Sequence, residues 1–320
     1  MAEPFLFALW EIACILLAAA LFSSPAFRFM DSATASAREN RLDGLRYLLA
    51  ALVVFHHNEY FYFLSQTGRW TISNPTNQFL GKFGVIIFFI ISGYLFYDTA
   101  RGRADWFRFY IKRVFRIFPI SLLSAACCVF IAIWLGLRAG ASLDFHGILY
   151  WFNGGLTNTR PYINGNWQTV VIDAGVTWSL QWEWLLYFSL PLFALFSRGV
   201  WRLELVIAIL FGCNTLLHAS QPEAAFFISL FCLGGICREI RNRAPHIDKT
   251  FLDSMLALLL VACVAAGLDA DPYAPPMLLL YGAFFACVAL GADLFGLFTT
   301  RGFRRLGITK IGRASCRERV

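Results

Sequence analysis

Long apolar runs follow one another along almost the whole chain, and this pattern restricts the possible folds more than any single motif does. About nine runs approach or reach the roughly 17–25 residues that a helix needs to cross a bilayer, and the sixth and seventh are short. They cover approximately residues 5–22, 45–64, 80–97, 117–137, 176–196, 203–218, 223–237, 251–267 and 277–298. No run alternates over the length of a barrel strand. The sequence therefore predicts an all-α integral membrane protein, a bundle of about nine transmembrane helices.

The composition agrees with a membrane protein and argues against a nucleic-acid partner. Hydrophobic residues make up 58% of the chain and charged residues 15%. Ordinary soluble domains have roughly 45–50% and about 25%. The net charge of +7 arises from Lys and Arg that are spread over short connectors between apolar runs. We therefore expect a membrane-lipid environment and no binding to nucleic acid.

The basic residues alternate between connectors, as the positive-inside rule requires. Most Lys and Arg residues lie in connectors 23–44, 98–116, 197–202, 238–250 and 299–309. The connectors between these hold Arg69, Arg138 and Arg160, with Lys82 at the edge of a run. This alternation predicts a multi-pass protein of the plasma membrane, in a bacterium the inner membrane. The N-terminus is expected outside and the basic connectors in the cytoplasm.

The two ends of the chain need separate interpretation. The first run lacks a basic leading segment and carries Glu11 in its apolar centre, so we expect a retained helix rather than a signal peptide. The last ten residues, IGRASCRERV at 311–320, are polar where the pattern calls for another span. They also equal the translation of a nucleotide string that resembles a common sequencing-library adapter. Our hypothesis is that residues 1–310 form the membrane domain, that 311–320 are an artefact, and that a tenth helix is lost by truncation.

The segment RLDGLRYLLAALVVFHHNEY, residues 41–60, combines an apolar run with polar side chains that are costly in lipid. Such residues usually mark a substrate or ion path, so we expect a polar reaction or transport path here. Arg46 is placed at the inner end and His57 about 16 Å further outward. An imidazole in this position could act as a general base, form an acyl-histidine, or hydrogen-bond to a neighbouring helix. The residues alone do not decide between His56 and His57.

The longest outer connector, approximately 138–175, is rich in Asn, Gly and aromatic residues. Such a loop can present amides and ring faces to a polar partner such as a sugar. The alternative is an aromatic belt at the membrane interface.

Four segments together resemble the signature blocks of the acyltransferase-3 family of membrane O-acyltransferases. They are RLDGLRYLLAALVVFHH at 41–57, GKFGVIIFFIISGYLF at 81–96, FYIKRVFRIFP at 109–119 and TWSLQWEWLLYFSLP at 177–191. Their order and approximate spacing match the family, and RRLGITK at 304–310 resembles the start of its closing block. The resemblance implies transfer of an acyl group, usually acetyl, from cytoplasmic acyl-CoA. The implied acceptor is a hydroxyl on an extracytoplasmic glycan or lipid-linked sugar, as in O-acetylation of a polysaccharide.

The resemblance also implies catalytic residues. The family's Arg-x10-His spacing selects His57 as the general base, and leaves His56 as a packing residue. Arg46 either pairs with Asp43 or holds a phosphate or the acyl carbonyl, with an interfacial anchor as the alternative. Glu183 would orient His57 or bind the acceptor at a similar depth, with a structural ion pair as the alternative.

The remaining implied residues would bind the two substrates. Arg113 and Arg116, three residues apart in the cytoplasmic connector, would grip the phosphates of acyl-CoA. Interfacial anchoring is the alternative for both. Asn58, Ser92 and Trp178 are expected to contact substrate. The chain contains no HExxH or paired CxxC motif, so no metal is expected.

Three classes of function remain open from the sequence. The first is a membrane O-acyltransferase. The second is a transporter or flippase for a polar or glycan substrate, whose intramembrane polar residues line a path. The third is a non-catalytic membrane scaffold, which would tolerate changes at Arg46, His57 and Glu183.

Overall fold

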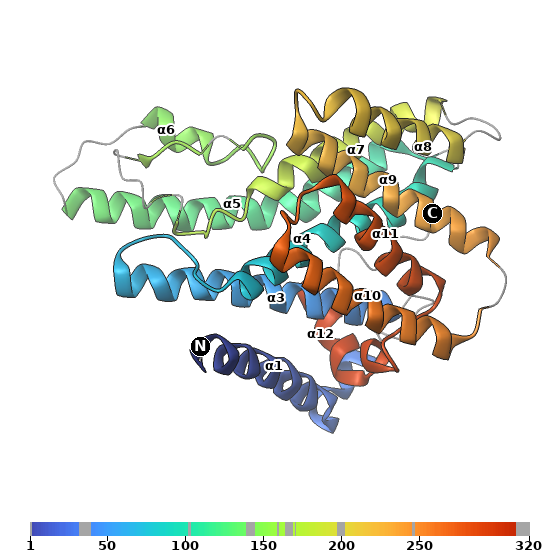
Figure 1. The fold of residues 1–320 in the computed structure, drawn as a ribbon. Helices are drawn as coiled ribbons and strands as arrows, with labels where there is room; N and C mark the ends of the chain where they lie inside the picture. The colour runs from blue at the N-terminus through green and yellow to red at the C-terminus, as the bar shows by residue number, and fades with distance from the viewer. Residues whose placement is uncertain are drawn as a thin grey trace. The chain divides into compact units, whose positions relative to one another are not determined.

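In the described part of the computed structural model all regular secondary structure is helical, and no strand is present (Figure 1). It describes residues 2–31, 40–101, 104–138, 145–158, 160–163, 169, 171–196, 202–244 and 247–311. The chain divides into two compact units, one formed by Met1–Thr99 with Ser197–Val320 and the other by Ala100–Phe196. Each unit is described by itself.

The first unit is a bundle built mainly on helices α3, α4 and α9. Its helical segments are α1 (Ala2–Ser23), η1 (Pro25–Met30), α3 (Asn40–Thr67), α4 (Pro75–Phe96), η2 (Tyr97–Arg101), α8 (Arg202–Gly212), η5 (Cys213–Leu217), α9 (Pro222–Arg243), α10 (Lys249–Asp269), α11 (Pro275–Leu290), η6 (Leu297–Thr299) and α12 (Arg301–Ile311). The start of α4 shows how the sequence determines where a helix begins. The Asn74 side chain accepts hydrogen bonds from the amides of Thr76 and Asn77, and Pro75 follows at the first helical position.

Glycines let α4 and α9 approach closely. A Cβ atom added at Gly93 would lie 2.2 Å from the Phe231 carbonyl oxygen, and one at Gly234 would lie 2.2 Å from that of Ile90. Small residues at such crossings are typical of membrane helices, because close approach increases their van der Waals contact.

The second unit consists of α5 (Trp106–Arg138), α6 (Phe145–Tyr150), α7 (Trp178–Phe196) and the connector before α7. Trp151 is 2% exposed and packs in a cluster with Ala132 of α5 and Ile163 of the connector. Its indole Nε1 donates to the Pro161 carbonyl oxygen at 3.0 Å. The connector is therefore fastened to α5 by a buried tryptophan.

Each predicted apolar run overlaps a helical segment, so the predicted all-α membrane class is confirmed. Within the described ranges, three helical segments are long and apolar enough to cross a membrane: Pro75–Thr99, Trp106–Gly136 and Lys249–Asp269. Leu9–Ser23 and Pro275–Leu290 are apolar but shorter. The number of spans, about nine here or ten with a lost one, stays a prediction.

Two predicted boundaries are wrong. Helix α5 begins at Trp106 and not near residue 117, because the basic residues before the apolar run continue the helix. Helix α11 ends at Leu290 and not near residue 298, because Gly291 takes a φ of 137° that breaks the helix. The last carbonyls of α11 are capped from other helices, since Arg41 donates to Ala289 O at 3.1 Å and Arg241 to Leu290 O at 2.9 Å.

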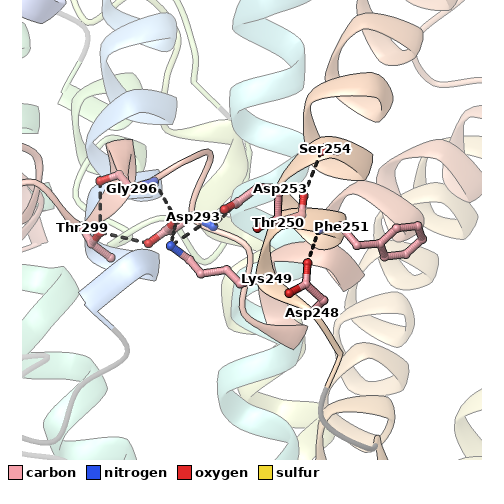
Figure 2. Close-up of polar contacts among 9 residues, drawn as sticks. All are labelled: Asp248, Lys249, Thr250, Phe251, Asp253, Ser254, Asp293, Gly296 and Thr299. Carbon is pink, nitrogen blue, oxygen red and sulfur yellow. Dashed lines mark hydrogen bonds and ion pairs between the residues drawn. The ribbon is translucent and has the colours of Figure 1, made fainter.

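The connector after α11 is organised around Asp293, which is 5% exposed (Figure 2). Its carboxylate lies 2.7 Å from Lys249 Nζ and accepts hydrogen bonds from Gly296 N at 2.8 Å and Thr299 Oγ1 at 3.0 Å. Its own amide donates to Asp253 Oδ1 at 2.8 Å. One buried carboxylate thus ties this connector to the start of α10.

Helix α12 was not expected from the apolar pattern, and it is anchored by one arginine. Arg305 is 1% exposed, lies 2.8 Å from Asp31 and donates to the carbonyl oxygens of Phe22 and Ser24. It therefore caps the end of α1. The proposed artefact at 311–320 lies outside the described residues, apart from the backbone of Ile311 at the end of α12.

Candidate functional site

Arg46 and His57 lie on one face of a single helix. Helix α3 is continuous from Asn40 to Thr67. Eleven residues at 3.6 per turn bring His57 back to within about 20° of Arg46 around the axis, whereas His56 lies about 80° away. Helix geometry therefore places His57, the histidine that the family spacing selects, on the face of Arg46, and places His56 on a different face.

The His57 ring is held in one orientation by its own helix. Its Nδ1 atom lies 2.7 Å from the carbonyl oxygen of Val53. A carbonyl oxygen can only accept, so in the neutral ring the proton lies on Nδ1 and Nε2 carries the lone pair. The half-buried ring is thus in the tautomer that could accept a proton at Nε2.

His56 fills a different role. A Cβ atom added at Gly81 of α4 would lie 2.2 Å from the His56 side chain, so the ring packs directly against the α4 backbone. The ring also makes a T-shaped contact with Tyr60, at 5.1 Å between ring centroids. This agrees with its expected role as a packing residue.

Arg46 Nη1 lies 3.5 Å from Asp43 Oδ1, which is one of the arrangements that the sequence left open. The backbone around Asp43 is tightly packed. A Cβ at Gly44 would lie 1.9 Å from Phe298 O, and one at Gly307 would lie 2.0 Å from Asp43 O. Segment η6 and helix α12 therefore hold the turn of α3 that carries Arg46.

The expected substrate residues of this unit differ in exposure. Asn58 is exposed. Ser92 is half-buried, and its hydroxyl donates to Phe88 O of its own helix at 3.0 Å. That bond is local to α4 and does not by itself indicate a ligand.

Three buried polar residues of this unit form a cluster that the motif analysis missed. Asn77 Nδ2 donates to Glu11 Oε1 at 3.1 Å and also to Glu59 Oε2. All three side chains are at most 5% exposed, so Glu59 is buried although it lies in the outer part of its predicted run. Glu11 of α1 thus forms a hydrogen bond to a neighbouring helix. The bonds join α1, α3 and α4 within their apolar interface.

The second unit brings Arg113 and Glu183 to one tyrosine. Tyr187 is fully buried, and its hydroxyl donates to Glu183 Oε1 at 2.5 Å. The Arg113 guanidinium carbon lies 5.5 Å from the Tyr187 ring and 5.1 Å from that of Phe109. Tyr187 was missed as a functional residue, although its spacing of four from Glu183 places both on one face of α7.

The two arginines of the basic connector lie in the N-terminal part of α5, because that helix begins before the apolar run. Arg113 and Arg116 fall in the second and third turns of α5. Arg113 is 2% exposed, whereas Arg116 is half-buried. Their predicted role in phosphate binding stays a prediction.

Trp178 begins α7 and lines a cavity of about 570 Å³ in the second unit. The other lining residues are Asn158, Arg160, Pro161, Tyr162, Asp173, Gly175 and Thr177. All belong to the long connector that the charge pattern places outside. Of the residues predicted to contact substrate, Trp178 is thus placed at a cavity.

The helical bundle with polar side chains inside apolar helices defines a multi-pass membrane protein. A family model described as an acyltransferase domain matches residues 39–316, which include every predicted site residue. The chain therefore belongs to the acyltransferase-3 family.

A curated relative shares part of the chain. Nodulation protein 10 of Rhizobium leguminosarum bv. viciae is 29% identical over 182 residues. These cover 52% of this chain and 46% of that protein, so the chain spans about half the length of this relative. No solved structure matches the chain.

Proposed function

We propose that the protein is a membrane O-acyltransferase that moves an acyl group, in the simplest case acetyl, from cytoplasmic acyl-CoA to a hydroxyl of an extracytoplasmic glycan or similar acceptor. The family match supports the reaction class. The observation that carries the mechanism is the bond between His57 Nδ1 and Val53 O, because it leaves Nε2 able to accept a proton.

In the proposed step, His57 Nε2 takes the proton of the acceptor hydroxyl as its oxygen attacks the thioester carbonyl carbon. The new C–O bond forms and the C–S bond breaks. Coenzyme A leaves as the thiolate and receives the proton from His57. Arg46, on the same face of α3 but about 16 Å nearer its cytoplasmic end, would hold a phosphate of the donor, or its acyl carbonyl before the thioester reaches His57.

The other predicted residues divide between the two substrates. Arg113 and Arg116 would bind the phosphates of acyl-CoA, where two guanidinium groups on one helix give charge-assisted hydrogen bonds. Glu183 would orient the reacting groups through its bond with Tyr187. Asn58, Ser92 and Trp178 would contact the acceptor.

The test replaces His57 by Gln in the full chain and measures transfer of labelled acetyl from acetyl-CoA to cell-surface and lipid-linked glycans by mass spectrometry. We expect a loss of about 10²–10⁴-fold, the usual effect of removing a general base. His218→Gln, a histidine outside the motif, is the matched control and should leave transfer unchanged. Full transfer by the His57→Gln protein would overturn the mechanism. Substrate crossing the membrane without consumption of acyl-CoA would instead establish the transporter alternative.

A further inference from the structure

The cavity in the connector before α7 combines the groups that recognise a hydroxylated ring. Its volume of about 570 Å³ falls within the roughly 300–1,000 Å³ that is usual for small-molecule sites. Its walls carry a guanidinium, a carboxylate, an amide, a hydroxyl and two aromatic rings, from Arg160, Asp173, Asn158, Thr177, Tyr162 and Trp178. A purely lipid-facing aromatic belt has no need of the two charged groups.

The two charged groups are held in place before any ligand arrives. The Arg160 guanidinium carbon lies 5.7 Å from the centroid of the buried Trp151 ring, and its Nη1 donates to Thr157 O at 3.2 Å. Asp173 Oδ1 accepts from Gly175 N at 3.0 Å, which closes a turn just before α7. Groups fixed in this way lose little conformational entropy when a ligand binds.

The electrostatics of the cavity suit a neutral polar ligand. Burial raises the pKa of Asp173 above its ordinary value, while the Gly175 amide and the charge of Arg160 oppose this shift. A guanidinium donates and a carboxylate accepts, so together they can satisfy both functions of a sugar hydroxyl. Charges of opposite sign in one cavity give no preference for an anion or a cation.

The aromatic residues provide the apolar part of the recognition. Tyr162 is 55% exposed and Trp178 is partly exposed. A sugar ring has an apolar C–H face beside its hydroxyls, and aromatic side chains offer a flat apolar surface with a polar end. The rings and the charged groups would therefore contact different sides of one ligand.

We propose that this cavity is a binding subsite for a sugar ring of the acceptor, with Arg160 and Asp173 contacting hydroxyls and Trp178 contacting the ring face. The role of the subsite in transfer rests on the proposed function. Glu183 follows Trp178 by five residues, roughly 7.5 Å along α7, so the Trp178 side of the subsite and that carboxylate lie on one helix. The subsite would select the acceptor and leave the donor unaffected.

The test measures equilibrium binding of labelled glucose, galactose and N-acetylglucosamine, each as monomer and tetramer, to the full chain in detergent. Asp173→Asn, Arg160→Gln and Trp178→Ala should each weaken binding about tenfold or more, as expected for lost hydrogen bonds to charged groups or a lost aromatic contact. Glu223→Gln and Tyr150→Ala are the matched controls, an exposed carboxylate and an exposed aromatic outside the cavity, and should stay within about twofold. Trp178→Phe should keep most of the binding, which separates a lost contact from misfolding.

Transfer kinetics distinguish this proposal from the proposed function. Cavity variants should raise KM for the sugar acceptor with KM for acetyl-CoA unchanged, and His57→Gln should bind the probe sugars normally while losing transfer. Acetyl transfer with unaltered acceptor KM in all three variants would overturn the subsite and leave the reaction standing. If the variants lose sugar binding and the wild type transfers no acetyl group, the subsite stands and the proposed reaction is rejected. A wild-type chain that binds none of these sugars would overturn the subsite.

Discussion

At the scale of single residues, the two neighbouring histidines of α3 have different surroundings. His57 shares a helical face with Arg46 and has its Nδ1 bonded to Val53, whereas His56 packs on Gly81. The period of the helix already contains the first difference, so sequence spacing could predict it. The packing of His56 depends on the approach of another helix, which a single sequence does not specify.

Tyr187 offers a test at the same scale, because its hydroxyl is the donor to Glu183 Oε1. Tyr187→Phe removes that donor and keeps the ring beside Arg113. Hydrogen bonds to charged groups contribute about 1.5–3 kcal/mol, so we expect kcat to fall about 10–100-fold. The measurement is steady-state acetyl transfer.

Two controls accompany this variant. Thermal unfolding of the Tyr187→Phe protein shows whether it still folds, and Tyr110→Phe tests the loss of a nearby hydroxyl. Tyr110→Phe loses a bond from its hydroxyl to the backbone oxygen of Tyr187 and should keep near-normal transfer. Equal losses of kcat in both variants would argue that Glu183 is not oriented by the Tyr187 hydroxyl.

Asp293 leads to a prediction about pH. Burial disfavours its charged form, but the hydrogen bonds from Lys249, Gly296 and Thr299 outweigh burial and hold its pKa below the ordinary value. A carboxyl with a lowered pKa in the folded state stabilises the fold above its unfolded pKa, near 3.9, and this contribution is lost as the pH falls through the folded value. The midpoint temperature of thermal unfolding should therefore decrease when the pH is lowered below about 4.

The comparison that isolates this effect is Asp293→Asn. This variant should unfold at a lower temperature near neutral pH and should show a weaker dependence on acid than the wild type. Parallel curves for the two proteins between about pH 3 and pH 7 would assign the acid sensitivity to other carboxyls.

At the scale of elements, the apolar runs predicted where helices lie but not where they end. The run at 277–298 continues past Leu290, yet α11 stops there because Gly291 and the bonds around Asp293 redirect the chain. In the same way, α5 extends through basic residues that looked like a connector. Helix ends depend on caps and distant partners, whereas helix centres depend on local hydrophobicity.

The crossing of α4 and α9 can be tested with one methyl group. Gly234→Ala places a Cβ 2.2 Å from the backbone oxygen of Ile90, so the helices must separate. Overpacking of this kind costs about 1–3 kcal/mol, and we expect a lower midpoint of thermal unfolding. Gly212→Ala is the matched control, because a Cβ there meets no atom within 4 Å. Helix propensity alone favours Ala over Gly, so Gly212→Ala should not lower the midpoint. A similar loss in both variants would mean that the close approach of α4 and α9 does not set the cost.

For the whole molecule, the sequence predicted the membrane class and the family, and both are confirmed. It missed the buried cluster of Glu11, Asn77 and Glu59, because those residues lie on three helices and no spacing links them. The cavity beside Trp178 was anticipated only as a loop rich in amides and rings. The presence of Arg160 and Asp173 in one cavity could not be predicted, because it depends on how the connector folds.

The proposed orientation is a property of the whole chain and has a direct test. Fusions of alkaline phosphatase after the second predicted run, near residue 70, should be active, because that enzyme works outside the cytoplasm. Fusions near residue 245, in a basic connector, should be inactive. The reverse pattern would place the N-terminus in the cytoplasm and put the cavity beside Trp178 on the wrong side for an external acceptor.

The amide of Asn77, which serves two buried carboxylates at once, affects how loss-of-function data on this protein should be interpreted. Changing Asn77 to Asp would set three acidic groups together inside an apolar interface, at a cost to insertion and folding. In a mutational scan, positions 11, 59 and 77 would then score as strongly as His57 without any part in chemistry. Scoring membrane abundance beside activity would separate the two groups, because His57 variants should remain abundant and inactive.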